Sequence, residues 1–194
     1  MDPHISIRQK HHDFKIHLHQ ALVPPDFERR LACIAWLTEA REEGIISNIL
    51  WSDETRFNNN GIVNRHNCHY WASENPHWLR ETNFQHIWGI NVWCGIINSQ
   101  IIGPKFYEGN LNSQIYLEFL VNELPVLLED VLLVVKERMY FQQDGAPPHN
   151  VRITTDYLND TFPHRWIGKN EANRWPVRSP DLTPLDFFVG LFIS

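Results

Sequence analysis

The chain has 194 residues, of which 43% are hydrophobic, and it carries a formal net charge of −6. This acidic balance is unlike that of proteins that hold nucleic acid by bulk charge, although carboxylates clustered in a site also lower the net charge. Eight tryptophans and eleven phenylalanines exclude a disordered chain and favour one ordinary folded domain with an appendage.

The sequence predicts a soluble, intracellular protein without a membrane span. Its opening segment, Met1-Asp2-Pro3-His4, is polar and has no signal-peptide pattern. No apolar run approaches the roughly 20 residues that a bilayer span needs. The cysteines are odd in number and lack the CxxC spacing, so we expect reduced, buried or half-buried thiols at Cys33, Cys68 and Cys94.

Residues 1–44 are predicted to form a linker followed by one helix. Residues 1–23 are polar, and Pro24-Pro25 separates them from a helical pattern that starts at Asp26 and ends at Gly44. The apolar positions of that pattern are Phe27, Leu31, Ile34, Ala35 and Leu37. Four histidines suggest a zinc site, but their irregular spacing and the absence of an accompanying cysteine favour a polar linker: His11, His12, His17 and His19.

Residues 45–107 are predicted to form an antiparallel meander. The apolar run from Ile45 to Trp51 indicates a buried strand with Asp53 at its exit. Residues 87–97 alternate large apolar with small or polar side chains. Asn98-Ser99-Gln100 then fits a turn before a returning strand, so this part of the chain reads as a hairpin.

The hydrophobic period changes from strand to helix between Asn110 and Leu128. Asn112 is a plausible N-cap, and Pro125 either kinks this helix or begins a second one. One helical face collects the apolar side chains Leu117, Leu120, Val121, Leu124, Leu127 and Leu128.

A second apolar run, Met139 to Asp144, predicts a strand, which is followed by a helix near 151–158 and a short strand at 165–168. The strands that carry Asp53 and Asp144 are expected to lie side by side and parallel, linked by the crossover helix. Both carboxylates would then lie at the same end of a mixed sheet, where α/β sheets bind ligands.

Three aspartates stand in motifs that suit metal-binding carboxylates. If folding brings them together, they form an oxygen-rich site for a hard divalent cation of the kind that acts on phosphate esters. The motifs are Trp51-Ser52-Asp53-Glu54-Thr55, Gln142-Gln143-Asp144-Gly145-Ala146-Pro147-Pro148-His149, and Trp175-Pro176-Val177-Arg178-Ser179-Pro180-Asp181-Leu182-Thr183-Pro184-Leu185-Asp186-Phe187-Phe188.

In this order the three motifs resemble the catalytic domain of Tc1/mariner-type transposases, in the DDE/DDD superfamily of ribonuclease H-like fold. The resemblance implies an α/β fold with a mixed five-stranded sheet, three antiparallel strands and then parallel strands, flanked by helices. It implies an interdomain linker and helix remnant at 1–44 and a catalytic domain at 45–194. The implied function is metal-dependent DNA cleavage and strand transfer at transposon ends in the nucleus, with DNA as partner and a homodimer as the working form.

By this resemblance, Asp53, Asp144 and Asp186 are expected to be the catalytic residues and the ligands of Mg²⁺, for which Mn²⁺ substitutes. Two such ions about 4 Å apart activate an attacking oxygen and stabilise a leaving oxygen. Asp181 is the rival for the third position, which the family pattern assigns to Asp186. Glu54 is expected to face away from Asp53.

His149 resembles the family's histidine after the second aspartate, and we expect it to orient a ligand or contact DNA rather than bind metal. Arg152 and Arg178 flank the motifs and could contact phosphates. Charged side chains of this kind are more often solvated surface, which also holds for Lys169 and Arg174.

Two departures from the family pattern leave a second interpretation open. The helix-turn-helix part expected before the linker is missing from the sequence, and only eight residues follow Asp186. A helix of about two turns there is too short to be stable without packing. The chain is therefore expected to be shortened at both ends. The alternative to an active enzyme is an inactive or domesticated remnant that acts as a nucleic-acid or protein interaction module.

Overall fold

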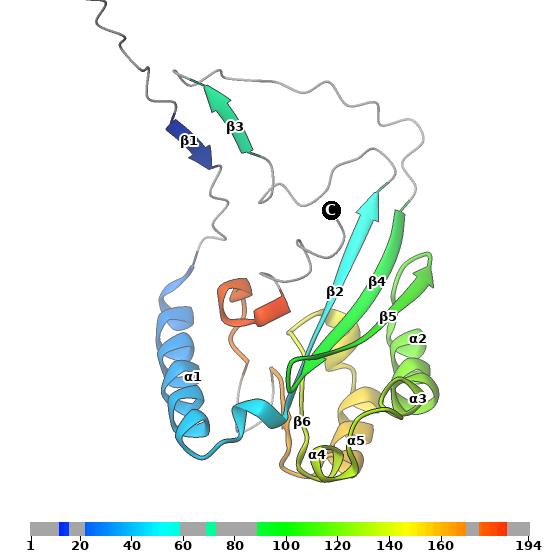
Figure 1. The fold of residues 1–194 in the computed structure, drawn as a ribbon. Coiled ribbons are helices and arrows are strands. Elements are labelled where there is room, and N and C mark those ends of the chain that lie inside the picture. Colours follow the sequence, from blue (N-terminus) through cyan, green and yellow to red (C-terminus); the bar gives the residue numbers. More distant parts are fainter. Residues whose placement is uncertain (1–11, 16–21, 59–68, 73–88, 170–174, 186–194) are drawn as a thin grey trace, which may run out of the picture. The chain divides into compact units, whose positions relative to one another are not determined.

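The computed structural model describes residues 12–15, 22–58, 69–72, 89–169 and 175–185 (Figure 1). The chain divides into two compact units. The smaller unit comprises residues 1–19 and 58–88, and in it strand β1 (His12–Lys15) pairs antiparallel with β3 (His69–Ala72). The larger unit comprises residues 20–57 and 89–194 and contains the predicted motifs. Strand β1 lies within the stretch that was expected to be a linker.

A five-stranded mixed sheet forms the framework of the larger unit, in the order β5-β4-β2-β6-β7. Figure 1 shows helix α1 beside one face of this sheet and helices α2 to α5 beside the other. The mixed sheet flanked by helices confirms the predicted fold class. Its strands are β2 (Ile49–Asn58), β4 (Gly89–Ile97), β5 (Gln100–Glu108), β6 (Tyr140–Gln142) and β7 (Trp166–Ile167).

The strands that lead to Asp53 and Asp144 are neighbours and run parallel, as the sequence predicted. Ile49 of β2 lies opposite Tyr140 of β6, and β6 also pairs in parallel with β7. However, β2 starts only after a short 3-10 turn at Ile46–Asn48, and Asp53 lies inside the strand rather than at its exit. The strand continues because its other neighbour, β4, is nine residues long, whereas β6 ends at Gln142.

Strands β4 and β5 form the predicted antiparallel hairpin. The two turn residues, Asn98 and Ser99, both have positive φ angles, 46° and 64°. A two-residue turn of this kind matches the right-handed twist of the strands that it joins. Asparagine tolerates this conformation better than most residues, so the local sequence suits the turn.

Helix α1 (Pro24–Glu42) begins two residues before the predicted start. The side chain of Asp26 accepts a hydrogen bond from the backbone N–H of Val23 at 3.0 Å, which satisfies a donor at the helix start. Gly44, with a φ of +73°, follows the helix end in the left-handed conformation that glycine adopts without strain.

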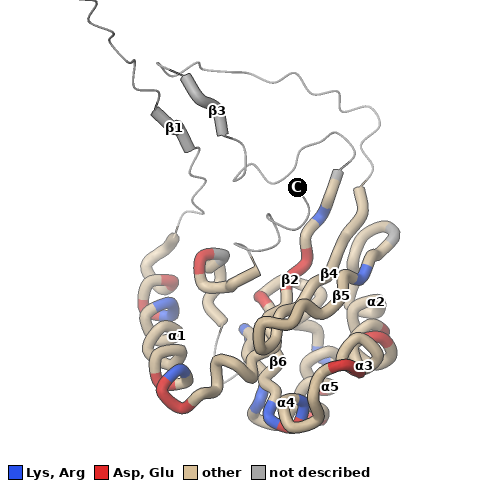
Figure 2. Tube along the Cα trace, viewed as in Figure 1, with Lys and Arg blue, Asp and Glu red and all other residues tan. Residues whose placement is uncertain are grey.

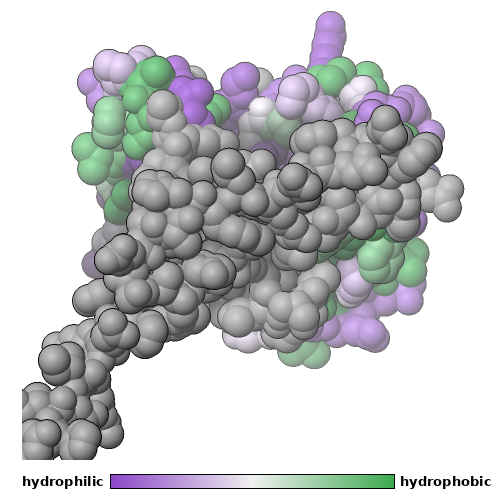
Figure 3. Space-filling model, turned by 90° about the horizontal axis from the view of Figure 1, so that it is seen from above, coloured by the Kyte–Doolittle hydropathy of each residue, from purple (hydrophilic) through white to green (hydrophobic). Residues whose placement is uncertain are grey.

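The buried face of α1 is not the face that the apolar spacing suggested. Cys33 and Ala40 are buried, whereas Phe27, Leu31 and Ile34 are exposed. Hydrophobic surface appears at the edge where α1 lies (Figure 3). Periodicity alone could not settle which face packs, because the inward face combines the small residues Cys33 and Ala40 with only partly buried Trp36 and Leu37.

The predicted helix at 110–128 is interrupted ahead of Pro125. Asn112 caps it as predicted, since its side chain accepts hydrogen bonds from the N–H groups of Gln114 and Ile115, both at 3.0 Å. A π-helical turn precedes the proline, which cannot donate a backbone hydrogen bond. The elements are α2 (Ser113–Glu118), the π-helical turn (Phe119–Glu123), α3 (Leu124–Leu127), α4 (Leu133–Arg138), which was not predicted, and α5 (Arg152–Thr161).

Both faces of the sheet are buried, and they form two hydrophobic clusters. Leu50 belongs to the cluster that includes Tyr116 and Phe141, under helices α2 to α5. Ile49 and Trp51 belong to the cluster that includes Cys33 of α1. Because successive side chains of a strand point to opposite faces, Asp53 shares the α1 face and Glu54 shares the opposite face. Within the described chain, no helix is long and apolar enough to cross a bilayer.

Candidate functional site

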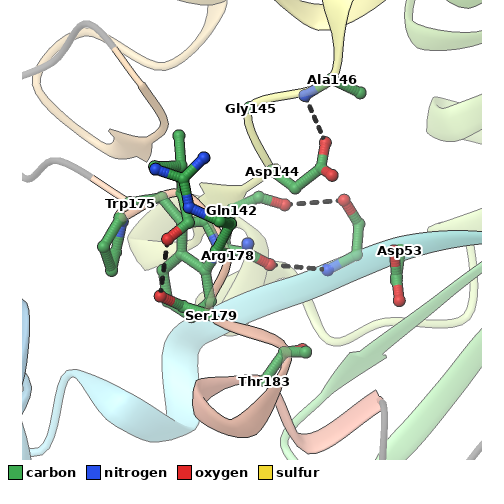
Figure 4. Close-up of a pocket in the computed structure, with 12 residues that line it drawn as sticks. Asp53, Gln142, Asp144, Gly145, Ala146, Trp175, Arg178, Ser179 and Thr183 are labelled. Carbon is green, nitrogen blue, oxygen red and sulfur yellow. Dashed lines mark hydrogen bonds between the residues drawn. The ribbon is translucent and has the colours of Figure 1, made fainter. Parts of the chain in front are cut away.

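A pocket of about 360 Å³ opens where β6 ends beside β2 (Figure 4). Its lining comes from Ser52 and Asp53 of β2, from Gln142 at the end of β6 and residues 144–146 after it, and from residues 175–179 and Thr183. Asp53 and Asp144 both line it. Each follows the paired residues Ile49 and Tyr140 by four positions, which is why two parallel strands deliver them to one end of the sheet.

Beyond the regular ladder, Ser52 and Gln142 hold β2 and β6 together. The backbone N–H of Ser52 donates to Oε1 of Gln142 at 3.1 Å, and the Ser52 hydroxyl donates to the Gln142 carbonyl at 2.7 Å. Both residues are buried. These bonds fix the spacing of the two strands directly beneath Asp53 and Asp144.

The Asp144 carboxylate is anchored through one oxygen. Its Oδ1 accepts a hydrogen bond from the N–H of Ala146 at 2.8 Å and lies 2.7 Å from Nδ1 of His149. The side chain is 47% exposed. Both contacts use Oδ1, so Oδ2 is available to a ligand in the pocket.

Asp53 and Glu54 form an acidic segment of β2 (Figure 2). Their side chains leave the strand on opposite faces of the sheet. The Asp53 carboxylate accepts a hydrogen bond from the N–H of Glu54 at 2.8 Å, and in Figure 4 it points away from Asp144. Glu54 lies on the opposite face, as expected, and its Oε2 is 3.3 Å from Nε2 of His149.

The structure therefore groups Glu54, Asp144 and His149, whose potential ligand atoms all lie within 4.8 Å of one another. The sequence assigned no role to Glu54 and did not predict its contact with His149. An available signal was the even spacing between Leu50 and Glu54, which places both on the side that α2 covers.

Burial and neighbouring polar groups determine the protonation of His149 and Asp144. Burial disfavours a charged His149, but the negative charge of Glu54 and hydrogen bonds to Asp144 and Glu54 outweigh it and raise the His149 pKa to about 10. Burial likewise opposes an ionised Asp144, but His149 and the Ala146 N–H outweigh it and lower the pKa of that carboxyl. At neutral pH His149 is therefore held as an imidazolium beside Asp144.

Arg178 lines the pocket, but its guanidinium is bound by helix α1. Its Nε donates to Oδ2 of Asp26 at 2.9 Å, and Nη2 lies 2.5 Å from the same oxygen. The backbone of Arg178 is left-handed, with a φ of 57°. Asp181, the rival for the third catalytic position, binds Arg30 through both carboxylate oxygens at 2.9 and 2.5 Å.

Arg152 lies at the surface and Asp186 outside the described residues. The Arg152 side chain is 92% exposed and its Nε is 3.5 Å from Asp156. The described segment before Asp186 ends at Leu185, which is completely buried. Other predicted residues also lie outside the described parts of the chain: His11, His17, His19, Cys68 and Arg174.

Comparison with known proteins adds to this geometry. No protein-family model matches the chain. Over 150 residues, 76% of its length, the chain is 28% identical to the transposable element Tc3 transposase of Caenorhabditis elegans. The chain spans 41% of the length of that relative.

Two solved structures share the fold. One is the Mos1 transposase catalytic domain with raltegravir and magnesium, with a TM-score of 0.60 and 20% identity over 89% of this chain and 72% of that chain. The other is a Mos1 transposase paired-end complex with the left transposon end, with a TM-score of 0.59 and 20% identity over 91% of this chain and 52% of that chain. In sequence and in its ribonuclease H-like fold, the chain is similar to the catalytic domain of Tc1/mariner-type transposases.

Proposed function

We propose that this chain is the catalytic part of a DNA transposase that cleaves and transfers DNA strands at transposon ends. The observation that carries the proposal is the placement of Asp53 and Asp144 in one pocket, at the ends of paired parallel strands. The likeness to Tc3 transposase supports it, as does the shared fold of the Mos1 paired-end complex. Because the chain spans 41% of the Tc3 protein, the activity of the whole transposase is part of the proposal.

The pocket suits Mg²⁺, with Mn²⁺ as a substitute. Carboxylate oxygens are the ligands that these hard cations prefer, and Oδ2 of Asp144 is available. Asp53 would join after a rotation of its side chain toward the pocket, and Asp186 would supply the third carboxylate. When bound, such cations activate an attacking oxygen and stabilise the leaving oxygen of a phosphodiester.

The protein side chains orient the reactants and supply no nucleophile. In the first step, a water oxygen bonds to phosphorus and the P–O3′ bond breaks. The proton of the water passes to the leaving oxygen, which leaves a 3′-hydroxyl and a 5′-phosphate. In the second step, the 3′-hydroxyl attacks a phosphodiester of target DNA. Asp53, Asp144 and Asp186 would hold the cations, and His149 would orient Asp144.

DNA binding requires positive charge near the pocket. Arg152 is exposed at the start of α5 and is suited to a phosphate contact. Arg178 is suited to orient the pocket wall rather than to bind DNA, because Asp26 occupies its guanidinium. The same proposal holds that the protein acts as a homodimer and is located in the nucleus.

A strand-nicking assay tests the proposal. The full chain is incubated with Mn²⁺ or Mg²⁺ and plasmid DNA that carries the transposon end, and the nicked product is measured over time. Asp144→Ala should slow nicking roughly 100-fold or more, because displacing reacting groups by about 1 Å already costs that much. Asp160→Ala, a change at an exposed aspartate of α5, should nick like the wild type. Equal product from wild type and Asp144→Ala would instead favour the inactive interaction module.

A further inference from the structure

We infer that Glu54 is a positioning residue for the second catalytic carboxylate, and that it acts on Asp144 through His149. The inference rests on the proposed function, since Asp144 must bind a cation for its orientation to matter. It assigns Glu54 and His149 to one chain of contacts that ends at Oδ1 of Asp144.

The contacts form an unbroken path between two elements. Glu54 comes from β2 and His149 from the 3-10 turn at Pro147–Asn150. Oε2 of Glu54 lies 3.3 Å from Nε2 of His149, and Nδ1 on the other side of the ring lies 2.7 Å from Oδ1 of Asp144. Glu54 cannot reach the pocket beside Asp53, because adjacent residues of a strand face opposite ways.

The imidazole ring is held firmly enough to transmit position. His149 is 1% exposed, and Tyr116 packs against its ring with centroids 4.2 Å apart. Gln143 donates from Nε2 to the His149 carbonyl at 3.1 Å, and its Oε1 accepts from the Tyr116 hydroxyl at 2.9 Å. The ring therefore cannot turn without disturbing the packing around it, so Nδ1 stays aimed at Asp144.

Two buried polar atoms lie on this path and are not fully satisfied. Within the described chain, Oε1 of Glu54 is buried without a hydrogen-bond partner, and Nε2 of His149 has Oε2 of Glu54 3.3 Å away but no hydrogen bond of regular geometry. Buried polar atoms in this state are uncommon in native proteins and call for an explanation. A positioning role for Glu54 explains them: its carboxylate would hold the His149 ring against Asp144, the expected cation ligand. Contacts of this type, one step removed from the metal, orient metal ligands.

The test is the affinity of the full chain for Mn²⁺, followed through the electron paramagnetic resonance signal of free Mn²⁺. Glu54→Gln keeps the shape of the side chain and removes its charge. It should weaken Mn²⁺ binding roughly 10-fold to 100-fold, the range typical of such outer contacts. The matched control is Glu118→Gln, the same change at an exposed glutamate on α2, which should bind Mn²⁺ like the wild type.

A second variant and a folding measurement distinguish weaker Mn²⁺ binding from loss of folding. Glu54→Asp keeps the charge but withdraws the carboxylate from His149, so it should also weaken Mn²⁺ binding. Thermal unfolding in metal-free buffer identifies the temperature range in which each variant is folded, and affinities are compared there. Wild-type affinity in the folded Glu54 variants would overturn the inference and leave the proposed function intact. Wild-type affinity in Asp144→Asn would overturn the proposed function, and this inference with it.

Discussion

Asp53 and Glu54 are adjacent in sequence but face different parts of the molecule. Strand alternation predicts this divergence and was enough to expect Glu54 to point away from Asp53. The partner of Glu54 could not be predicted, because His149 reaches it only through the turn that follows β6. The pairing depends on tertiary structure, which a pattern in one strand does not contain.

Gly95 in β4 provides a test of packing at the centre of the sheet. A Cβ atom at this position would lie 2.9 Å from Cδ1 of Leu50 and 2.9 Å from the ring of Trp93. Gly95→Ala should therefore lower the free energy of unfolding by about 1–3 kcal/mol, measured by urea denaturation. Gly145→Ala is the control, because its Cβ would meet nothing closer than 3.6 Å. Equal stability of the two variants would contradict this packing.

Cys33 should be a slow nucleophile in the folded protein. Burial raises the pKa of its thiol from 9.0 to about 11, so the thiolate fraction at pH 8 falls about 100-fold. Alkylation by iodoacetamide, mapped by peptide mass spectrometry, should be slower at Cys33 in native buffer than in urea by a similar factor. The free thiols of Cys33 and Cys94 agree with the expectation of reduced cysteines. Rapid native alkylation of Cys33 would show that its face of α1 does not pack against the cluster that includes Ile49 and Trp51.

At the scale of elements, α1 is joined to the 178–181 segment by two ion pairs, Asp26 with Arg178 and Arg30 with Asp181. The second pair is bidentate, and Arg30 also donates to the Ser179 hydroxyl at 2.7 Å. This helix therefore supports one wall of the pocket. The sequence predicted the helix but not its role, because the arginines and aspartates that join the two segments are about 150 positions apart.

The Asp26 carboxylate should make stability depend on pH. The Val23 N–H lowers its pKa below the ordinary value of 3.8, burial opposes this, and Arg178 lowers it further. Because the folded pKa is depressed, the stabilisation is complete above about pH 3.8 and is lost as pH falls through the folded value. Asp26→Asn should thus be less stable than wild type at pH 7.

The difference between wild type and Asp26→Asn should shrink in acid, as measured by urea denaturation from pH 7 to pH 3. Asp160→Asn, at an exposed position outside the ion pairs, should differ little from wild type throughout. A gap between wild type and Asp26→Asn that stays constant in acid would show that Asp26 acts by packing rather than by charge.

Across the whole molecule, hydrophobic period and connection length predicted individual strands and two of their pairings, whereas the five-stranded sheet as a whole was expected from the family resemblance. The hairpin at 98–99, the cap at Asn112 and the parallel pairing of β2 with β6 were all predictable from local rules. Helix α4 was not predictable in this way, because three consecutive apolar residues at its start are exposed rather than buried: Leu132, Leu133 and Val134. The pairing of β1 with β3 joins segments that share no recognisable pattern, and the role of Asp186 stays a prediction.

A cation that binds the folded pocket should stabilise the whole molecule. At a Mn²⁺ concentration 100 times the dissociation constant, linkage gives about 2.7 kcal/mol, or a rise in melting temperature of roughly 5 to 10 °C. Differential scanning calorimetry of the wild type with and without Mn²⁺ measures the rise. Asp144→Asn should show a much smaller one, and an equal rise in both proteins would place the binding of Mn²⁺ elsewhere.

Whether Asp53 and Asp144 share a divalent cation can be measured by anomalous diffraction from crystals of the full chain soaked in Mn²⁺. We expect an anomalous peak in the pocket, about 2.1 Å from an oxygen of each aspartate, with His149 still bound to Oδ1 of Asp144. A peak coordinated by Glu54 and His149 without Asp53, or no peak at a Mn²⁺ concentration that saturates the protein in solution, would contradict it.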